Sequence, residues 1–318
     1  MPRLAPFLAA ACICVASPPT LADAPARCTL SDVQPFLARG AGSRTYPPEM
    51  LEWLTTRKGQ YVEPFKAFDN LWYVGGCWVG AWVITSPDGV ILLDTLYEPL
   101  TEMLFENLGK AGVKPESVKY VLMTHGHWDH IGGSERLKGL LPNARFVMSE
   151  RGWNEAINGS RARPGFPPWK MIERDMVVKD GDVIALGGTR LTVYETPGHS
   201  NGTISFAFDV ADGARTYRAF TVGGLATATI TSSKQAEDYV ASVKRVQGFV
   251  ADTARPVDVY VATHLYQSCD VNATGDALRA RKAGEPHPMV DQAKFARELE
   301  RLLKGGEDKL DAERKSGR

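Results

Sequence analysis

Five of the six histidines in this chain occupy positions typical of metal ligands. Three of them fall in one short run, His125-Gly126-His127-Trp128-Asp129-His130, directly after the apolar segment 118–124. His199 and His264 each come at the end of a further strand-like run, 191–198 and 257–263. Imidazole nitrogens and carboxylate oxygens are the usual protein ligands of catalytic zinc, so this pattern predicts a metal site.

The six ligand-type residues divide into two sets of three. His125 and His127 can converge on one cation, with His199 as the third ligand, and a catalytic zinc with three protein ligands keeps a position open for water. Ligation by nitrogen and carboxylate without thiolate favours zinc, while iron, manganese and cobalt stay open. We therefore predict two zinc ions per chain. The second set is Asp129, His130 and His264.

Such a pair of metals supports one class of reaction, metal-assisted hydrolysis. Two metals about 3.5–4 Å apart can share a hydroxide whose parent water has its pKa lowered to around 7. No serine, cysteine or threonine nucleophile is then needed. Asp129 can bind metal and also accept a proton from the hydroxide's parent water, so we predict a catalytic role for it. Trp128 and Tyr266 flank ligands and are candidate substrate contacts, with ordinary packing as the alternative for both.

The composition is that of an ordinary globular protein. Of 318 residues, 44% are hydrophobic and 23% are charged, and the 37 Lys and Arg residues balance the 37 Asp and Glu residues. This balance gives no electrostatic reason to expect a nucleic acid or an anionic membrane as partner. A small-molecule substrate is the expected partner, and the sequence does not indicate the oligomeric state.

Residues 1–24 have the pattern of a secretory signal peptide. Arg3 precedes an apolar run without charge, 4–16, and Ala22-Asp23-Ala24 is a plausible cleavage motif. The apolar run is too short to span a bilayer as a helix. A buried helix and lipidation at Cys12 are the alternatives. We expect a periplasmic or secreted protein whose mature chain, 25–318, does not insert into a membrane.

Removal of this segment leaves three cysteines, Cys28, Cys77 and Cys269. In an oxidising compartment three cysteines allow one disulfide and one free thiol, and the sequence does not select the pair. None lies inside the histidine motif, so we interpret all three as structural or incidental.

The first half of the mature chain predicts a hairpin followed by alternating helices and strands. A turn at Pro87-Asp88-Gly89 joins two strands, and a strand leads into His125. Residues 150–175 contain three prolines and two tryptophans and are predicted to form an irregular loop over a site. The other predicted elements are helices at 48–55, 98–111 and 134–141, and strands at 70–74, 82–85, 90–93 and 144–148.

The second half predicts a further set of strands and then helices. The segment from Gly305 onward is charged and is predicted to fray. Two successive halves of this kind indicate two sheets packed together with helices outside, in a single α+β domain over 25–318 with its core at about 60–304. The predicted elements are strands at 183–186, 191–195, 204–209 and 217–222, helices at 237–250 and 291–303, and a strand into His264.

These motifs together resemble the metallo-β-lactamase superfamily. The resemblance spans about residues 68–265 and implies a four-layered αββα sandwich. Within the superfamily, subclass B3 is most similar, because its members have an all-histidine first site, a second site of Asp, His and His, no ligand cysteine and an export signal. The residues that carry the resemblance are Ser86-Pro87-Asp88-Gly89-Val90-Ile91-Leu92-Leu93-Asp94, the run 125–130, Thr196-Pro197-Gly198-His199-Ser200, and His264.

The resemblance implies an exported β-lactamase that opens cyclic amides by attack of a metal-bridging hydroxide, and hence antibiotic resistance. Two features depart from the subclass: the stretch 221–226 lacks serines that help hold the antibiotic carboxylate, and Trp128 stands where a small residue is usual. The same stretch lacks the bridging aspartate of glyoxalase-like and lactonase-like members, which argues against those branches. The alternatives are a zinc hydrolase of the same fold acting on an ester, lactone or aryl halide, and a non-catalytic zinc-binding module.

Overall fold

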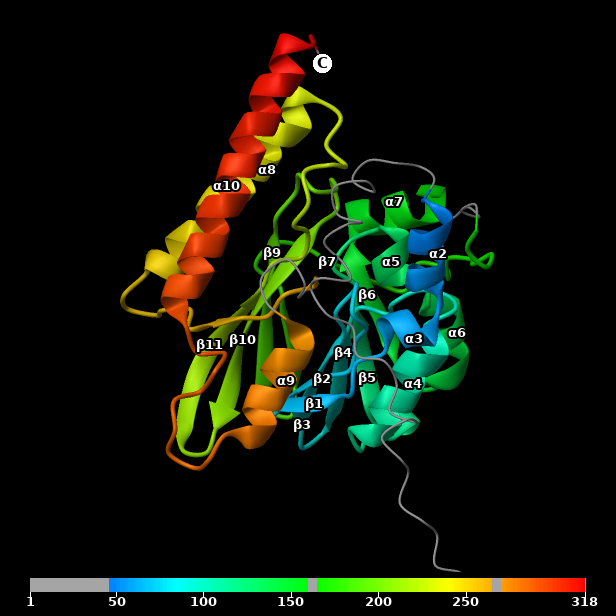
Figure 1. Cartoon of the computed structure of the whole chain (residues 1–318), viewed down its shortest axis with the longest axis vertical. Helices are drawn as coiled ribbons and strands as arrows, with labels where there is room; N and C mark the ends of the chain where they lie inside the picture. The colour runs from blue at the N-terminus through cyan, green and yellow to red at the C-terminus, as the bar shows by residue number, and fades with distance from the viewer. Residues whose placement is uncertain (1–45, 160–164, 265–269, 318) are drawn as a thin grey trace, which may run out of the picture.

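Two β-sheets pack face to face between two layers of helices in the computed structural model of the chain (Figure 1). The structure describes residues 46–159, 165–264 and 270–317. The layers follow the order helix, sheet, sheet, helix, so the predicted αββα arrangement is confirmed. The predicted signal peptide 1–24, Tyr266, Cys28 and Cys269 lie outside the described residues.

The first sheet has seven strands in chain order. Its strands are antiparallel as far as β4 and parallel from β4 onward. Ser86 pairs with Gly89, which confirms the predicted hairpin turn. The first and last strands were not predicted. The strands are β1 (Phe65–Phe68), β2 (Leu71–Tyr73), β3 (Trp82–Ser86), β4 (Gly89–Leu93), β5 (Val118–Leu122), β6 (Arg145–Ser149) and β7 (Met176–Val178).

The second sheet has five strands in the order β12-β11-β10-β9-β8. All neighbours are antiparallel except β11 and β12, which run parallel after the chain has crossed over through a long helix. The strands are β8 (Val183–Leu186), β9 (Thr189–Glu195), β10 (Ile204–Asp212), β11 (Arg215–Thr221) and β12 (Val259–Tyr260).

Helices cover the outer face of each sheet. Figure 1 shows α8 and α10 side by side on one flank and the helices of the first half on the other. On the first sheet lie α2 (Pro48–Thr55), α3 (Arg57–Gln60), α4 (Thr101–Lys110), α5 (Trp128–Ile131), α6 (Ser134–Leu140) and α7 (Glu150–Gly159), with the short 3-10 helix η2 (Pro115–Ser117). The others are α8 (Ser233–Ala251), α9 (Val271–Ala280) and α10 (Gln292–Lys315).

The alternation of side chains along the strands explains the layering. In β3, Ile84 belongs to the apolar cluster between the sheets, while its neighbour Val83 packs under the outer helices. In β5, Leu122 likewise belongs to the cluster between the sheets, and Val121 packs under the outer helices. Successive side chains of a strand point to opposite faces, so nearly continuous apolar strands bury both faces of the sheet.

The prediction of an irregular segment over 150–175 is wrong for its first part. Residues 150–159 form α7, which buries Trp153 and Ala156 on one face. The three prolines all lie after this helix, from Pro164 onward, so nothing in 150–159 interrupts helical hydrogen bonding. Among the described residues, the irregular part is confined to 165–175.

The C-terminal segment is also more ordered than predicted. Helix α10 continues through Gly305 to Lys315 and packs along α8. Glu313 is buried and pairs with Lys309, and Arg314 reaches Glu237 of α8 at 2.8 Å. Tertiary contacts therefore override the weak helix propensity of the two adjacent glycines.

Helix α4 begins at Thr101, three residues later than predicted, because Pro99 disfavours a helical conformation for the residue before it. Cys77 is buried and disulfide-bonded, and every other cysteine lies outside the described residues. Within the described residues, no helix combines the length and apolar character that crossing a membrane requires.

Candidate metal centre

The segment after β5, a turn followed by α5, supplies four of the six predicted ligands. His125 follows the strand by three residues, and α5 begins directly after His127. The turn passes so close to α7 that a Cβ on Gly126 would lie 2.9 Å from the backbone of Ala156 and from Cβ of Glu155. A glycine is needed there, so the spacing His-Gly-His has a packing reason as well as a chemical one.

The structure brings His125, His127 and His199 together. One potential ligand atom from each lies within 4.8 Å of the others. The ring centroids of His127 and His199 are 4.6 Å apart, and Nε2 of His125 lies 3.2 Å from Nε2 of His199. The predicted proximity of the loop after β9 to the turn after β5 is therefore confirmed.

Asp129, His130 and His264 form a second group within the same 4.8 Å limit. Nε2 of His130 lies 3.0 Å from Nε2 of His264, and Oδ2 of Asp129 lies 3.8 and 3.7 Å from these two nitrogens. The groups adjoin each other, since the ring centroids of His125 and His130 are 4.2 Å apart. The arrangement matches the two predicted sets, whose role as metal ligands stays a prediction.

In three of these histidines, the second ring nitrogen is held by a neighbouring oxygen. Nδ1 of His199 donates to the carbonyl of Ala226 at 2.6 Å, and Nδ1 of His264 donates to the carbonyl of Trp78 at 2.6 Å. Nδ1 of His130 lies 2.7 Å from Oδ2 of Asp94. A hydrogen bond to Nδ1 fixes the ring and its tautomer, so Nε2 is left to face the centre of each group.

This donor geometry suits zinc. Nitrogens bound 2.0–2.1 Å from a tetrahedral zinc lie roughly 3.3 Å from each other, close to the two separations between histidine Nε2 atoms. Unprotonated nitrogens at such distances repel each other unless a cation or proton lies between them. Both groups therefore fit a metal ion by ligand type, by spacing and by the bonds that orient the rings.

Burial and mutual proximity control the protonation of these groups. Burial lowers the pKa of His199 to about 4 and that of His264 to about 4. Burial works against ionisation of Asp129, but His130 and His264 outweigh it and hold the pKa of Asp129 at about 2. At neutral pH the second group thus contains an ionised carboxylate, and His199 and His264 are neutral, as metal ligands require.

Three residues that support the site were missed as functional residues. Asp94 directly follows β4 and is 1% exposed. It accepts hydrogen bonds from the backbone and hydroxyl of Thr124 as well as from His130. Its φ of +61° is unusual for a residue other than glycine, which marks the position as a special one. Thr124 also contacts Nδ1 of His125 at 3.1 Å. The third missed residue is Trp78, in the loop between β2 and β3.

Trp128 is buried beside the site. Its ring centroid lies 4.5 Å from that of Tyr97 and 4.4 Å from that of Phe166, and only 8% of the residue is exposed. This environment corresponds to the packing alternative. The prediction that it contacts substrate is not supported by its exposure.

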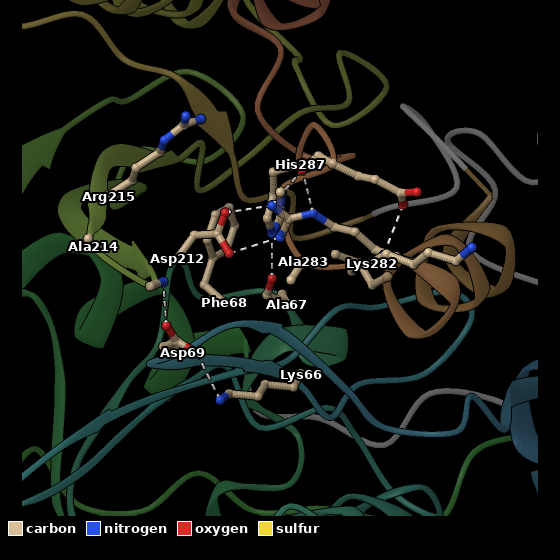
Figure 2. A pocket seen from close by; sticks show the side chains of 15 residues that line it. Lys66, Ala67, Phe68, Asp69, Asp212, Ala214, Arg215, Lys282, Ala283 and His287 are labelled. Carbon is tan, nitrogen blue, oxygen red and sulfur yellow. Dashed lines mark hydrogen bonds and ion pairs between the residues drawn. The ribbon is translucent and has the colours of Figure 1, made fainter.

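A separate cavity of about 510 Å³ shares no residue with the six predicted ligands (Figure 2). It lies between β1, the β10–β11 turn and the segment before α10. Arg281 forms two hydrogen bonds with the Asp212 carboxylate, at 2.8 and 2.7 Å. His287 donates to the carbonyl of Ala67 and stacks on Phe68 at 3.9 Å. These side chains satisfy one another's hydrogen-bonding groups, so we interpret the cavity as a structural contact between these elements. The sixth histidine, His287, is a packed core residue.

The two candidate metal-binding groups lie within an αββα fold that is typical of the metallo-β-lactamase superfamily. Residues 75–215 match the family model described as "Metallo-beta-lactamase superfamily". The chain therefore contains a metallo-beta-lactamase superfamily domain. This confirms the resemblance drawn from the motifs.

Solved structures similar to this chain include subclass B3 enzymes. BJP-1, a subclass B3 metallo-beta-lactamase of Bradyrhizobium japonicum, superposes with a TM-score of 0.70 and 26% identity, covering 85% of this chain and 99% of that one. The FEZ-1 metallo-beta-lactamase from Legionella gormanii gives a TM-score of 0.67 over 80% of this chain and 97% of that one. At 24% identity, the second likeness concerns the fold alone.

Curated relatives found by sequence carry other names. A hydroxyacylglutathione hydrolase of Francisella tularensis subsp. novicida is 31% identical over 114 residues, which is 35% of this chain and 37% of that protein. The mitochondrial persulfide dioxygenase ETHE1 of Homo sapiens is 30% identical over 121 residues, 37% of this chain and 38% of that protein. The chain thus matches less than two fifths of the length of these relatives, and their substrates differ from one another.

Proposed function

We propose that this chain is an exported, zinc-dependent hydrolase that opens cyclic amides, with β-lactams as its substrates. The observation that carries the proposal is the pair of adjoining groups, one of three histidines and one of Asp129, His130 and His264. A likeness to B3 metallo-β-lactamases over 85% of the chain supports the choice of substrate class.

The residues of the two groups have separable tasks. Metal ions bound there would supply Lewis acidity and a water acidified to a pKa near 7. Asp94 and the carbonyls of Trp78 and Ala226 orient the histidine rings. Asp129 is ionised at neutral pH, so its carboxylate can accept a hydrogen bond from a water in the group. This is the position that a proton acceptor must occupy.

Hydrolysis of a hydroxyacyl thioester is the second candidate. Its support is the match to hydroxyacylglutathione hydrolases, which covers about a third of this chain. The stretch 221–226 argues against it, because this stretch contains no carboxylate residue that could bridge the two groups. Gly224 is so close to His199 that a Cβ there would lie 2.6 Å from Cβ of the histidine.

A substrate panel tests the proposal directly. Purified protein loaded with zinc would be assayed against a penicillin, a cephalosporin, a carbapenem, an acyl lactone, an aryl ester, a halogenated aromatic and hydroxyacylglutathione. We expect β-lactam turnover near the typical enzyme value of about 10 s⁻¹ and its loss on chelation. Turnover confined to the thioester, or to any of the other non-lactam compounds, would contradict the choice of substrate.

Export is the second part of the proposal and rests on the pattern in residues 1–24. Expression in a Gram-negative host, followed by cell fractionation and N-terminal sequencing, would test it. We expect periplasmic protein that begins after Ala24. Protein that stays in the cytoplasm with residues 1–24 intact would contradict it.

A further inference from the structure

Trp78 contacts two residues of the second group at once. Its indole Nε1 donates to Oδ2 of Asp129 at 3.4 Å, and its backbone carbonyl accepts from Nδ1 of His264 at 2.6 Å. Its ring also packs edge-on against the His264 ring, with centroids 5.7 Å apart. A single residue outside the ligand set therefore contacts both Asp129 and His264.

These contacts restrict how the second group can move. The bond from Nδ1 of His264 to a carbonyl requires the tautomer in which Nε2 is free to bind a metal. The hydrogen bond from the indole is long and therefore weak. We expect it to restrict the rotation of the Asp129 carboxylate and to add little free energy of its own. Oδ2 of Asp129 is the same atom that lies 3.7 Å from Nε2 of His264.

The loop that carries Trp78 is fixed to the protein at several points. The buried side chain of Gln60 accepts from the backbone N–H of Trp78 at 2.9 Å and donates to the carbonyl of Trp53 at 3.1 Å. The carbonyl of Gln60 accepts from the N–H of Cys77 at 3.0 Å. Gly80 donates to the carbonyl of Thr263, the residue before His264, at 2.6 Å.

Helix α2 completes this support. Trp53 of α2 packs edge-on against Trp78, with ring centroids 5.9 Å apart and planes at 84°. Gln60 ends α3, so the N-terminal helices reach the second group through one buried amide and one aromatic contact.

We propose that Trp78 is a positioning residue that aligns Asp129 and His264, and that Gln60 and α2 hold it in place. The inference rests on the proposed function in that it takes the second group to be a metal site. It predicts that loss of the indole N–H weakens the second metal equivalent and leaves the first unchanged.

The test is metal binding by the full-length mature chain, measured by chelator competition with zinc and by the visible spectrum of the cobalt form. Trp78→Phe removes the N–H and keeps an aromatic ring. Trp153→Phe is the matched control, because Trp153 is buried and donates its indole N–H to the carbonyl of Met176 at 2.9 Å. We expect Trp78→Phe to lower affinity for the second equivalent about tenfold, with an altered cobalt spectrum, and Trp153→Phe to change neither.

Gln60→Met provides a second variant, since it keeps the side-chain length and removes both hydrogen bonds. We expect the same selective loss of the second equivalent. Unchanged affinity and spectrum in Trp78→Phe, or equal weakening of both equivalents, would overturn the inference. If the unmodified protein binds two metals but opens no β-lactam, only the substrate proposal fails. If it binds a single metal, both proposals fail.

Discussion

The carboxylate of Asp94 lies 2.7 Å from Nδ1 of His130, and both side chains are almost completely buried. Asp94 directly follows β4 and His130 lies in α5, so the contact joins the edge of the sheet to the short helix that carries two of the predicted ligands. A carboxylate behind a metal-binding histidine fixes the ring and makes it a stronger ligand.

Asp94→Asn should weaken the second metal equivalent about 10- to 100-fold. Asparagine has nearly the same shape and tolerates the positive φ of this position, so the change removes charge without imposing backbone strain. Zinc affinity measured by chelator competition checks this, with the exposed Asp88→Asn as control. Equal affinities in the two variants would show that Asp94 serves only to bind Thr124.

Asp129→Asn should lower kcat by at least about 10²-fold, the usual effect of losing a general base. The amide retains the shape but cannot accept the proton. Steady-state kinetics at saturating zinc separates this role from metal affinity. If excess zinc restored full activity, Asp129 would matter for binding metal alone.

Gly224→Ala should impair the first group selectively. The added Cβ would lie 2.6 Å from Cβ and Cδ2 of His199, so the ring must shift. We expect the affinity of the first metal equivalent to fall about tenfold. Gly109→Ala, where nothing lies within 4 Å, is the control and should keep both affinities. A first equivalent bound as tightly as in the unmodified protein would argue that His199 is not a ligand.

Two neighbouring glycines in α10 offer a matched test of the fold. A Cβ on Gly306 would lie 2.7 Å from the Tyr239 ring, whereas on Gly305 it would meet only Thr227, at 3.9 Å. Gly306→Ala should lower the free energy of unfolding by about 1–3 kcal/mol through overpacking. Gly305→Ala should raise it by up to about 1 kcal/mol through better helix propensity. Urea denaturation measures both, and equal effects would mean that α10 does not pack on α8 as described.

The two groups of predicted ligands could be found from the sequence because their members have a characteristic local spacing. Four ligand-type residues fall within six positions, and His199 and His264 each follow a strand-like run. Asp94 and Trp78 were not predictable in the same way, since they lie 36 and 51 positions from the residues they contact. Asp94 ends the stretch 86–94 that carries the family resemblance, but nothing in that stretch indicates a contact with His130, and Trp78 lies in no motif. Folding brings both residues to the predicted ligands.

The same distinction applies to the fold. The β3–β4 hairpin and the apolar strands have local signals and were predicted. Helix α10 beyond Gly305 depends on α8, which is distant in sequence, so local propensity indicated fraying where the structure has a helix. The prolines from Pro164 onward led to the prediction of an irregular segment that also included 150–159. These residues precede the prolines and form α7.

Both proposals require the two groups to bind two zinc ions. Elemental analysis of the mature protein, beside His264→Ala, tests this directly. We predict close to two zinc ions per chain in the unmodified protein and close to one in the variant, because only the second group loses a ligand. Zinc-free protein after purification and dialysis against zinc, or two zinc ions in both proteins, would contradict it.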